Sequence, residues 1–432
     1  MHRWSLEALN AEIRSGRIPF SSAIEYFLAR IERHAELNAY ISVACEFPTI
    51  STAGLGGVPI AIKDLLNIEG QETTAASKVL AGNVAGADAE VISRLRGLGA
   101  CLIGKTNLHE FAYGGSGMIS AYGPGKNPWN MEHITGGSSS GSAAAVAAGL
   151  CAAAIGTDTA GSIRLPASLC GIVGFKPTYD AISTEGVIPL SVSYDHVGPM
   201  TRSVEDARYL FSAMSGTELP AQKREGKLRV GIPETFFYSD LDPSVAKAMD
   251  EVLDAVRAAG HEIVRRDFEV DEDRTLASYE SYAYHRKWVE ECPELYQPET
   301  LRRIKSGEKI TSEAAGDAAS RLKVERTGAA EVFTGIDVML TPTVPILPPR
   351  IADLLEKPET LRPAELLMLR NTRPFNVLGV PTISVPWDLS PSGLPIGIQL
   401  AAAPKRDYEL LDIAEEFEKM SPWRGRVPAG FE

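Results

Sequence analysis

Two loops rich in hydroxyl groups carry most of the chemistry visible in this chain. The first, GGSSSGS at 136–142, combines four serines with three glycines and precedes an alanine-rich stretch. The second, GTDTAGSIRLP at 156–166, places hydroxyl side chains among further small residues. Small residues let backbone N–H groups approach a ligand closely, and a helix N-terminus favours negative charge. Taken alone, these loops are as consistent with flexible turns or a phosphate cradle as with a catalytic site.

The longer sequence around the loops resembles the amidase signature family, which includes stand-alone amidases and glutamyl-tRNA amidotransferase A subunits. The segment GGSSSGSAAAVAAGLCAAAIGTDTAGSIRLPASLCGIVGFKPT at 136–178 follows that family's signature nearly residue by residue. The resemblance continues in GGVPIAIKDLLNIEG (56–70), GACLIGKTNLHEFAYG (99–114), DHVGPMTRSVEDA (195–207) and NTRPFNVLGVPTISVP (371–386). Motifs this long, in the same order, are far more specific than a short motif. The resemblance implies an α/β fold with a large mixed β-sheet core and helices on both faces.

The resemblance also implies a Ser–Ser–Lys catalytic set. Lys63, in the context PIAIKD, matches the family's lysine. Ser138 matches the bridging serine, and Ser162, in AGSIR, matches the nucleophile. In the family the peptide bond before the bridging serine is cis, so we expect a cis bond between Gly137 and Ser138.

An oxyanion hole is implied by the same resemblance. Thr159, Ala160 and Gly161, together with Ser162, match the segment whose backbone N–H groups form that hole in the family. Many members carry a second glycine where this chain has Ala160. A methyl group there narrows the approach slightly but leaves the backbone N–H in place.

Elementary chemistry agrees with these roles. A serine hydroxyl is a poor nucleophile until a base takes its proton. A lysine can be that base only if burial or hydrogen bonding destabilises its ammonium form, and Lys63 follows an apolar strand. Ser138 could then relay the proton while Ser162 attacks an amide carbonyl and the loop N–H groups hold the oxyanion. The proton returns to the leaving amine, and water hydrolyses the acyl-enzyme.

The neighbouring residues are predicted to have supporting roles. Ser139 and the other serines of its loop are typical of turn and cap residues, and Ser139 is also a candidate support for Lys63. Asp158 and Arg164 flank the nucleophile, and we expect an ion pair that shapes the loop rather than a part in proton transfer.

Cofactor and metal chemistry have weak signals in this sequence. Cys170 is expected in the core because no histidine lies near it in sequence or motif. His109, His133 and His196 lack ligand spacing, so we expect neither a metal nor a cofactor. The stretch GACLIGKT at 99–106 satisfies the P-loop pattern, but that pattern needs a preceding strand and a following helix. Here an amphipathic helix precedes it and its middle residues are typical of a strand.

Three functions fit the motifs. The preferred one is a stand-alone amidase acting on a small-molecule amide. The second is the glutaminase A subunit of a tRNA-dependent amidotransferase, which TTAASKVL (73–80) and SAYGPGKNPWN (120–130) resemble; however, SEAAGDAASR (312–321) replaces the tyrosine-rich helix expected there. The third is an inactive binding member of the fold, against which the intact catalytic set argues. No motif marks the acyl pocket, so the substrate stays open.

The elements that must position these residues alternate between strand and helix. Strands are predicted at 58–62, 100–104, 228–232, 261–264, 338–340 and 382–385. Ser22 and Glu25 form a capping-box pattern before a helix, and Gly141 to Ala154 is predicted as an alanine-rich helix. The alternation favours one amidase domain over 1–432, with a signature core at about 56–210. A polar, helical segment at 270–335 is a candidate cap or subunit contact, for example in a homodimer.

Composition narrows the class of protein. The 432 residues are 44% hydrophobic, which excludes a disordered scaffold, and a net charge of −13 argues against direct binding to nucleic acid or an anionic membrane. The five scattered cysteines (Cys45, Cys101, Cys151, Cys170 and Cys292) are typical of reduced thiols. The N-terminus lacks the apolar region of a signal peptide, and the apolar run at 143–156 is too short, at about 14 residues, to span a bilayer. We expect a cytoplasmic protein.

Overall fold

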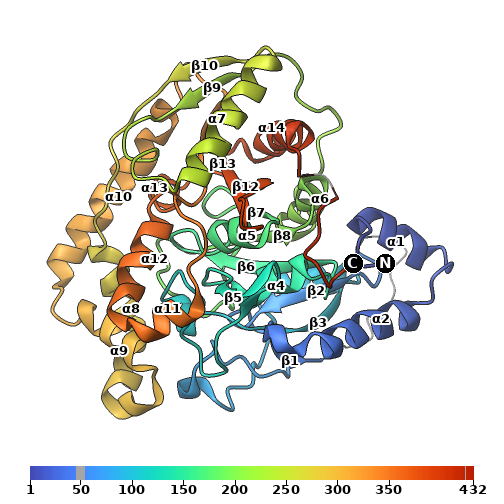
Figure 1. Cartoon of the computed structure of the whole chain (residues 1–432). Helices are drawn as coiled ribbons and strands as arrows, with labels where there is room; N and C mark the ends of the chain where they lie inside the picture. Colours follow the sequence, from blue (N-terminus) through green and yellow to red (C-terminus); the bar gives the residue numbers. More distant parts are fainter. Residues whose placement is uncertain (45–53, 424) are drawn as a thin grey trace.

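A computed structural model describes residues 1–44, 54–423 and 425–432 (Figure 1). The strands are β1 (Tyr40–Val43), β2 (Pro59–Lys63), β3 (Cys101–Thr106), β4 (Lys126–Asn127), β5 (Asn130–Ile134), β6 (Ala153–Asp158), β7 (Val173–Lys176), β8 (His196–Thr201), β9 (Arg229–Ile232), β10 (Glu262–Arg265), β11 (Val338–Pro342), β12 (Thr382–Leu389) and β13 (Pro395–Ala401).

The α-helices are α1 (Leu6–Arg14), α2 (Phe20–Arg33), α3 (Glu90–Gly97), α4 (Ser140–Ala147), α5 (Arg164–Cys170), α6 (Val204–Ser215), α7 (Pro243–Ala258), α8 (Thr275–Glu291), α9 (Pro298–Ile304), α10 (Ser312–Val332), α11 (Ile351–Glu356), α12 (Leu361–Leu369), α13 (Pro374–Val377) and α14 (Asp407–Met420). Short 3-10 turns are η1 (Ala35–Leu37), η2 (Lys78–Leu80), η3 (Glu110–Ala112), η4 (Pro293–Leu295), η5 (Lys305–Gly307) and η6 (Pro358–Thr360).

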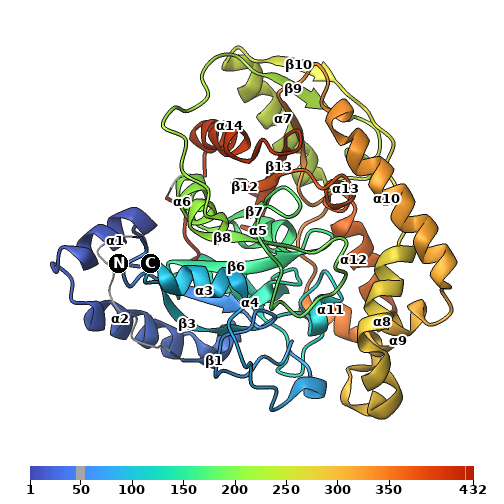
Figure 2. The ribbon, with the colours of Figure 1, turned by 180° about the vertical axis from the view of Figure 1, so that it is seen from behind.

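A large mixed sheet forms the centre of the fold. Within the described part of the chain it has 11 strands, in the order β1-β3-β2-β6-β8-β7-β12-β13-β11-β9-β10. Strand β2 runs parallel to β3 and β6, whereas β8 runs antiparallel to both β6 and β7. Helices pack on both faces, with α4 and α5 against the central strands and α6 and α14 also packing against them (Figures 1 and 2). The predicted α/β architecture is confirmed.

The central strands are buried along their whole length. Every residue of β2, β3 and β6 is buried, as expected for strands covered on both faces by other elements. Each of the six predicted strands begins within one residue of an observed one, namely β2, β3, β9, β10, β11 and β12. The apolar runs are therefore reliable guides to the strands that carry the site.

Two helix boundaries differ from the prediction. Helix α2 begins at Phe20, because the Pro19 carbonyl already accepts the N–H of Ala23, so Ser22 lies inside the first turn and does not cap it. The alanine-rich helix α4 ends at Ala147, since Gly149 turns the chain with a φ of +64°. The last two predicted helical residues, 153 and 154, therefore belong to strand β6.

The segment 270–335 is helical, as predicted. Helices α8, α9 and α10 make up most of it, and α8 packs against both of the others. Both views show the three helices together at one side of the molecule, next to α12 (Figures 1 and 2).

The P-loop-like stretch forms strand β3, as its apolar middle predicts. The Lys105 ammonium is buried and lies 2.8 Å from the carboxylate of Asp64. It also donates hydrogen bonds to the carbonyl of Leu66 and the hydroxyl of Thr73. In a P-loop this lysine would bind a phosphate, whereas here its ammonium group is bound by Asp64, Leu66 and Thr73.

Two further findings concern the class of protein. No helix in the described ranges is long and apolar enough to cross a membrane. Four cysteines are free thiols, of which Cys101, Cys151 and Cys170 are buried and Cys292 is partly buried, while Cys45 lies outside the described residues.

The buried Asp64–Lys105 pair gives a prediction for stability. Asp64→Ala leaves an uncompensated ammonium in the core, so we expect the free energy of unfolding to fall by about 3–5 kcal/mol in urea denaturation. The double variant Asp64→Leu, Lys105→Met should recover most of that loss because no buried charge remains. Glu12→Ala, which breaks an exposed pair with Arg17, is the control and should change stability little. A single Asp64→Ala variant as stable as the wild type would contradict this account.

Candidate active site

Strand β2 delivers its last residue, Lys63, into a fully buried position. The Lys63 Nζ donates hydrogen bonds of 2.7 Å each to the hydroxyl of Ser138 and the hydroxyl of Thr157. Thr157 comes from β6, the parallel neighbour of β2, so the sheet itself places this partner. Within the described chain, no carboxylate forms an ion pair with this ammonium.

Burial sets the protonation of this amine. Loss of hydration lowers the pKa of Lys63 to about 7, although the more distant charges of Asp158 and Asp195 act in the opposite direction. A lysine with a pKa near 7 holds comparable amounts of amine and ammonium at neutral pH, which an ordinary surface lysine does not. The amine can therefore accept a proton in the range where enzymes work.

The two hydroxyl-rich loops lie against each other. The peptide bond between Gly137 and Ser138 is cis, as the resemblance implies. The N–H of Ser139 donates to the carbonyl of Ser162 at 3.2 Å, which joins the first loop to the second. Ser138 is fully buried, and Ser162 is almost so, with 4% of its surface exposed. No direct hydrogen bond between these two hydroxyls forms in the described structure; such bonds are often long without substrate and tighten when it binds.

Asp158 shapes the second loop. Its carboxylate accepts the backbone N–H groups of Gly161, at 2.8 Å, and Ile163, at 3.1 Å. It also pairs with the guanidinium of Arg164 at 2.9 Å, so the predicted ion pair is confirmed. Burial alone would raise the pKa of Asp158, but Arg164 outweighs burial and holds that pKa well below its usual range.

Arg164 ties the loop to the C-terminal part of the chain. This fully buried guanidinium donates to the carbonyl of Thr372 and to the side-chain oxygens of Asn376 and Gln399, at 2.6–2.9 Å. The contacts satisfy a buried charge that would otherwise be costly. They also join two segments of the resemblance, 136–178 and 371–386, that lie far apart in sequence. The hydrogen bond between Arg164 and Asn376 links positions separated by 212 residues.

The backbone N–H groups of the loop differ in availability. The Gly161 N–H is already donated to Asp158, which is at odds with the expectation that it faces an oxyanion. In the described part of the chain, the N–H groups of Thr159, Ala160 and Ser162 have no hydrogen-bond partner. Side chains hold the loop from outside, because Thr159 donates its hydroxyl to Asp195 and Thr372 donates its hydroxyl to the carbonyl of Ala160.

Sequence reasoning misplaced one residue and missed two. In the described structure Ser139 makes no hydrogen bond with Lys63, since its hydroxyl donates to the carbonyl of Thr157 at 3.2 Å. Thr157 takes the supporting place, and Asp195 orients Thr159. Both missed residues lie within segments that the resemblance covers, but only the fold shows that Thr157 contacts Lys63 and that Asp195 contacts Thr159.

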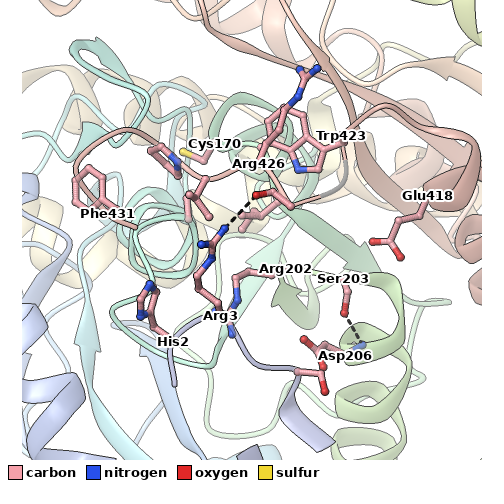
Figure 3. A pocket seen from close by; sticks show the side chains of 18 of the residues that line it. His2, Arg3, Cys170, Arg202, Ser203, Asp206, Glu418, Trp423, Arg426 and Phe431 are labelled. Atoms are coloured by element: carbon pink, nitrogen blue, oxygen red, sulfur yellow. Dashed lines mark hydrogen bonds between the residues drawn. The ribbon is translucent and has the colours of Figure 1, made fainter. Parts of the chain in front are cut away.

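A cavity of about 220 Å³ opens at Ser162, Thr159 and Ala160. The helical segment 270–335 supplies part of its wall through residues of α8 and α9 and their N-terminal and C-terminal flanks. A second, larger cavity of about 590 Å³ lies between the two chain ends, where Arg3 donates to the carbonyl of Gly425 (Figure 3). None of its lining residues is Lys63, Ser138 or Ser162, so we place the chemistry in the smaller cavity.

The described cysteine and histidine side chains offer no alternative site. Burial raises the pKa of the Cys170 thiol, which disfavours the reactive thiolate. Burial also lowers the pKa of His109 and of His196. Across residues 1–44, 54–423 and 425–432, no group of three or more His, Cys, Asp and Glu side chains is placed to hold a metal ion.

Comparisons with known proteins agree on one family. A sequence profile of the Amidase family matches residues 22–411. The A subunit of the glutamyl-tRNA(Gln) amidotransferase of Thioalkalivibrio sulfidiphilus is 34% identical over 100% of both chains. The 2-amino-5-chloromuconic acid deaminase of Comamonas testosteroni is 36% identical over 85% of this chain and 82% of its own. The solved structure of 6-aminohexanoate cyclic dimer hydrolase matches with a TM-score of 0.87 and 30% identity over 99% of each chain.

The close packing of Gly161 gives a prediction for stability. A Cβ at this position would lie 2.0 Å from the Thr372 hydroxyl, and φ is +135°, which disfavours any other residue. We expect Gly161→Ala to lower the free energy of unfolding by about 1–3 kcal/mol, measured by urea denaturation. The matched control is Gly316→Ala in α10, where a Cβ meets nothing within 4 Å, and this change should be neutral or stabilising. Equal stability of the two variants would contradict the prediction, because it would show that the loop can shift to accept the added methyl group at little cost.

Proposed function

This chain belongs to the amidase signature family, and from that premise we propose that it is a serine amidase that hydrolyses the C–N bond of a carboxylic amide. The observation that carries the proposal is the 2.7 Å contact between the buried amine of Lys63 and the Ser138 hydroxyl, beside a cavity that Ser162 lines. A buried lysine with a lowered pKa, a serine in contact with it and a second serine open to a cavity form a general-base and nucleophile arrangement.

The first half of the proposed reaction forms an acyl-enzyme. Neutral Lys63 takes the proton of Ser138, which takes the proton of Ser162 as the Ser162 oxygen attacks the amide carbonyl. Negative charge develops on the carbonyl oxygen, where the N–H groups of Thr159, Ala160 and Ser162 are the available donors. The C–N bond then breaks as the proton passes back through Ser138 to the leaving nitrogen.

The second half hydrolyses the ester on Ser162. A water molecule gives a proton through Ser138 to Lys63 and adds its oxygen to the acyl carbon. The bond from the acyl carbon to the Ser162 oxygen breaks, and that oxygen recovers the proton. The products are a carboxylate and an amine or ammonia, and the enzyme returns to its starting state.

A second candidate is the glutaminase subunit of an amidotransferase. It is supported by the 34% identity to an amidotransferase A subunit. Against it stands helix α10, where SEAAGDAASR at 312–321 lacks the tyrosines expected in that subunit. Purification separates the two, because a subunit that needs its partner should hydrolyse glutamine poorly alone, whereas a stand-alone amidase turns over its amide without one.

The proposal also covers the domain organisation and the cellular compartment. We treat 1–432 as one amidase domain with its signature core at about 56–210, and the helices of 270–335 as a cap over the cavity. The described cysteines are free and mostly buried, which suits a reducing compartment such as the cytoplasm.

The nucleophile is tested by covalent labelling. A fluorophosphonate should attach to Ser162 with loss of fluoride, and mass spectrometry of the digested protein should find the adduct on the peptide that contains it. Ser162→Ala should remain folded, lose the label and lose amide hydrolysis at least about a thousandfold. Ser140→Ala is the control and should keep both. An unlabelled wild-type protein would favour an inactive binding member of the fold.

The pH dependence tests the base. Because only neutral Lys63 accepts a proton, kcat/KM should rise with pH through the pKa of about 7 and level off above it. Thr157→Val removes a hydrogen-bond acceptor from the ammonium form, so the limb should move to lower pH. Lys63→Arg should be inactive, since a guanidinium stays protonated. A pH profile without this limb, or an active Lys63→Arg enzyme, would assign the base to another group.

Paired substrates test the relay through Ser138. Ser138→Ala breaks the proton path in both directions, so acylation and departure of the amine should both slow. Esters need little protonation of their leaving group, so they should lose less rate than amides with the same acyl group. Ser140→Ala, whose hydroxyl donates to the carbonyl of Asn107, should show no such difference. Equal losses on ester and amide in Ser138→Ala would return this residue to a structural role.

A further inference from the structure

Guanidinium groups dominate the wall of the cavity beside Ser162. Five arginines line it, and no aspartate or glutamate among the described residues does (Arg274, Arg302, Arg303, Arg362 and Arg373). They come from the residue before α8, from α9, from α12 and from the residue before α13. Such a concentration of positive charge contrasts with the net charge of −13 on the whole chain. It implies a ligand of negative charge.

Three of these arginines have carboxylate partners within the protein. Arg302 and Arg303 both pair with Glu299, at 2.7 and 2.9 Å. Arg303 also pairs with the buried Glu365 at 2.7 Å, and Arg362 lies 3.7 Å from that same carboxylate. Two carboxylates therefore serve three guanidinium groups, and these contacts account for the structural part of the cluster.

The other two arginines form no ion pair with a carboxylate in the described chain, although the charges of Asp271, Glu272 and Asp273 act on Arg373. Arg274 is half-buried and makes neither a hydrogen bond nor an ion pair there. Arg373 donates only to backbone carbonyls, those of Asp271 and Asp273, while the Asp273 carboxylate is taken by Arg321. Burial lowers the pKa of Arg274, and the neighbouring charge of Arg373 lowers it further, although Glu272 acts against this. A carboxylate bound by the two guanidinium groups would compensate their positive charges and so offset the cost of burial and of their mutual repulsion.

On the basis of the proposed amidase function, we propose that the substrate is a half-amide of a short dicarboxylic acid, whose free carboxylate is bound by Arg274 and Arg373. Arginine suits this role because its planar fork matches the two oxygens of a carboxylate. The cavity volume of about 220 Å³ is below the usual range for ligand pockets, which favours an acyl chain of few carbons. Hydrolysis then adds water across the C–N bond and yields a dicarboxylate and ammonia.

The same wall disfavours glutamine. The α-ammonium of an amino acid needs a carboxylate or carbonyl partner, and its charge would lie among guanidinium groups here. No acidic side chain lines the cavity within the described residues. The proposal therefore predicts that a half-amide without an α-amino group is preferred to glutamine. This preference would favour the stand-alone amidase over the glutaminase subunit.

Calorimetric binding to the Ser162→Ala protein tests the inference without turnover. The probes are the half-amides succinamate, glutaramate and adipamate, each compared with its neutral diamide and with glutamine, in buffer of low ionic strength. We expect at least one half-amide to bind about tenfold or more tightly than its diamide and than glutamine. Arg274→Gln in the same background should abolish this ratio, and Arg274→Lys should keep part of it because the charge remains.

The matched control is Arg257→Gln in the same background, an exposed arginine on α7 that pairs with Asp254 outside the cavity, and it should leave the ratio unchanged. Diamides that bind as tightly as half-amides, a ratio that survives Arg274→Gln, or no measurable binding of any half-amide would each overturn the inference. These outcomes are independent of the nucleophile, which fluorophosphonate labelling of the wild-type protein tests separately. A labelled protein without the preference would refute the substrate class alone, and an unlabelled protein with it would refute the amidase alone.

Discussion

A lysine amine can serve as a base near neutral pH only where water does not reach its ammonium form. Strand β2 meets this condition, because it is buried along its whole length and Lys63 is its last residue. Within the described chain, the hydrogen-bond partners of this amine are neutral oxygens of Ser138 and Thr157. A carboxylate at the same distance would favour the ammonium form, as Asp64 does for the neighbouring Lys105, whose pKa burial lowers and Asp64 raises. The difference between these two buried lysines separates the reactive amine from the structural one.

The nucleophile's loop depends on a second buried charge. The Asp158 carboxylate accepts hydrogen bonds from the backbone N–H groups that follow it in the loop, and it forms an ion pair with Arg164. The Arg164 guanidinium in turn donates to Asn376 and Gln399 in the C-terminal part. The position of Ser162 therefore depends on the folding of the whole chain rather than on its own loop. The same C-terminal part and the helices of 270–335 supply the arginines of the cavity, so the second half of the chain both holds the nucleophile's loop and contributes to the pocket.

Long apolar runs and the resemblance predicted the sheet, the helical segment 270–335 and the residues that meet at the site. Short polar patterns were less reliable. The capping pattern at Ser22 was wrong because the helix begins earlier, at Phe20, and the alanine run concealed the turn at Gly149. Thr157 was missed because its contact with Lys63 depends on strand pairing, which a sequence does not display. The arginine cluster was missed for a related reason, since its members come from four separate elements that only the fold brings together.

The central claim is that acyl transfer to Ser162 precedes attack by water. Partitioning with hydroxylamine measures this directly, because hydroxylamine competes with water for the acyl group and gives a hydroxamate. An amide and an ester with the same acyl group should give the same ratio of hydroxamate to acid at every hydroxylamine concentration, since both pass through one acyl-enzyme. Ratios that depend on the leaving group, or no hydroxamate at all, would show that water attacks the amide directly and would contradict the account.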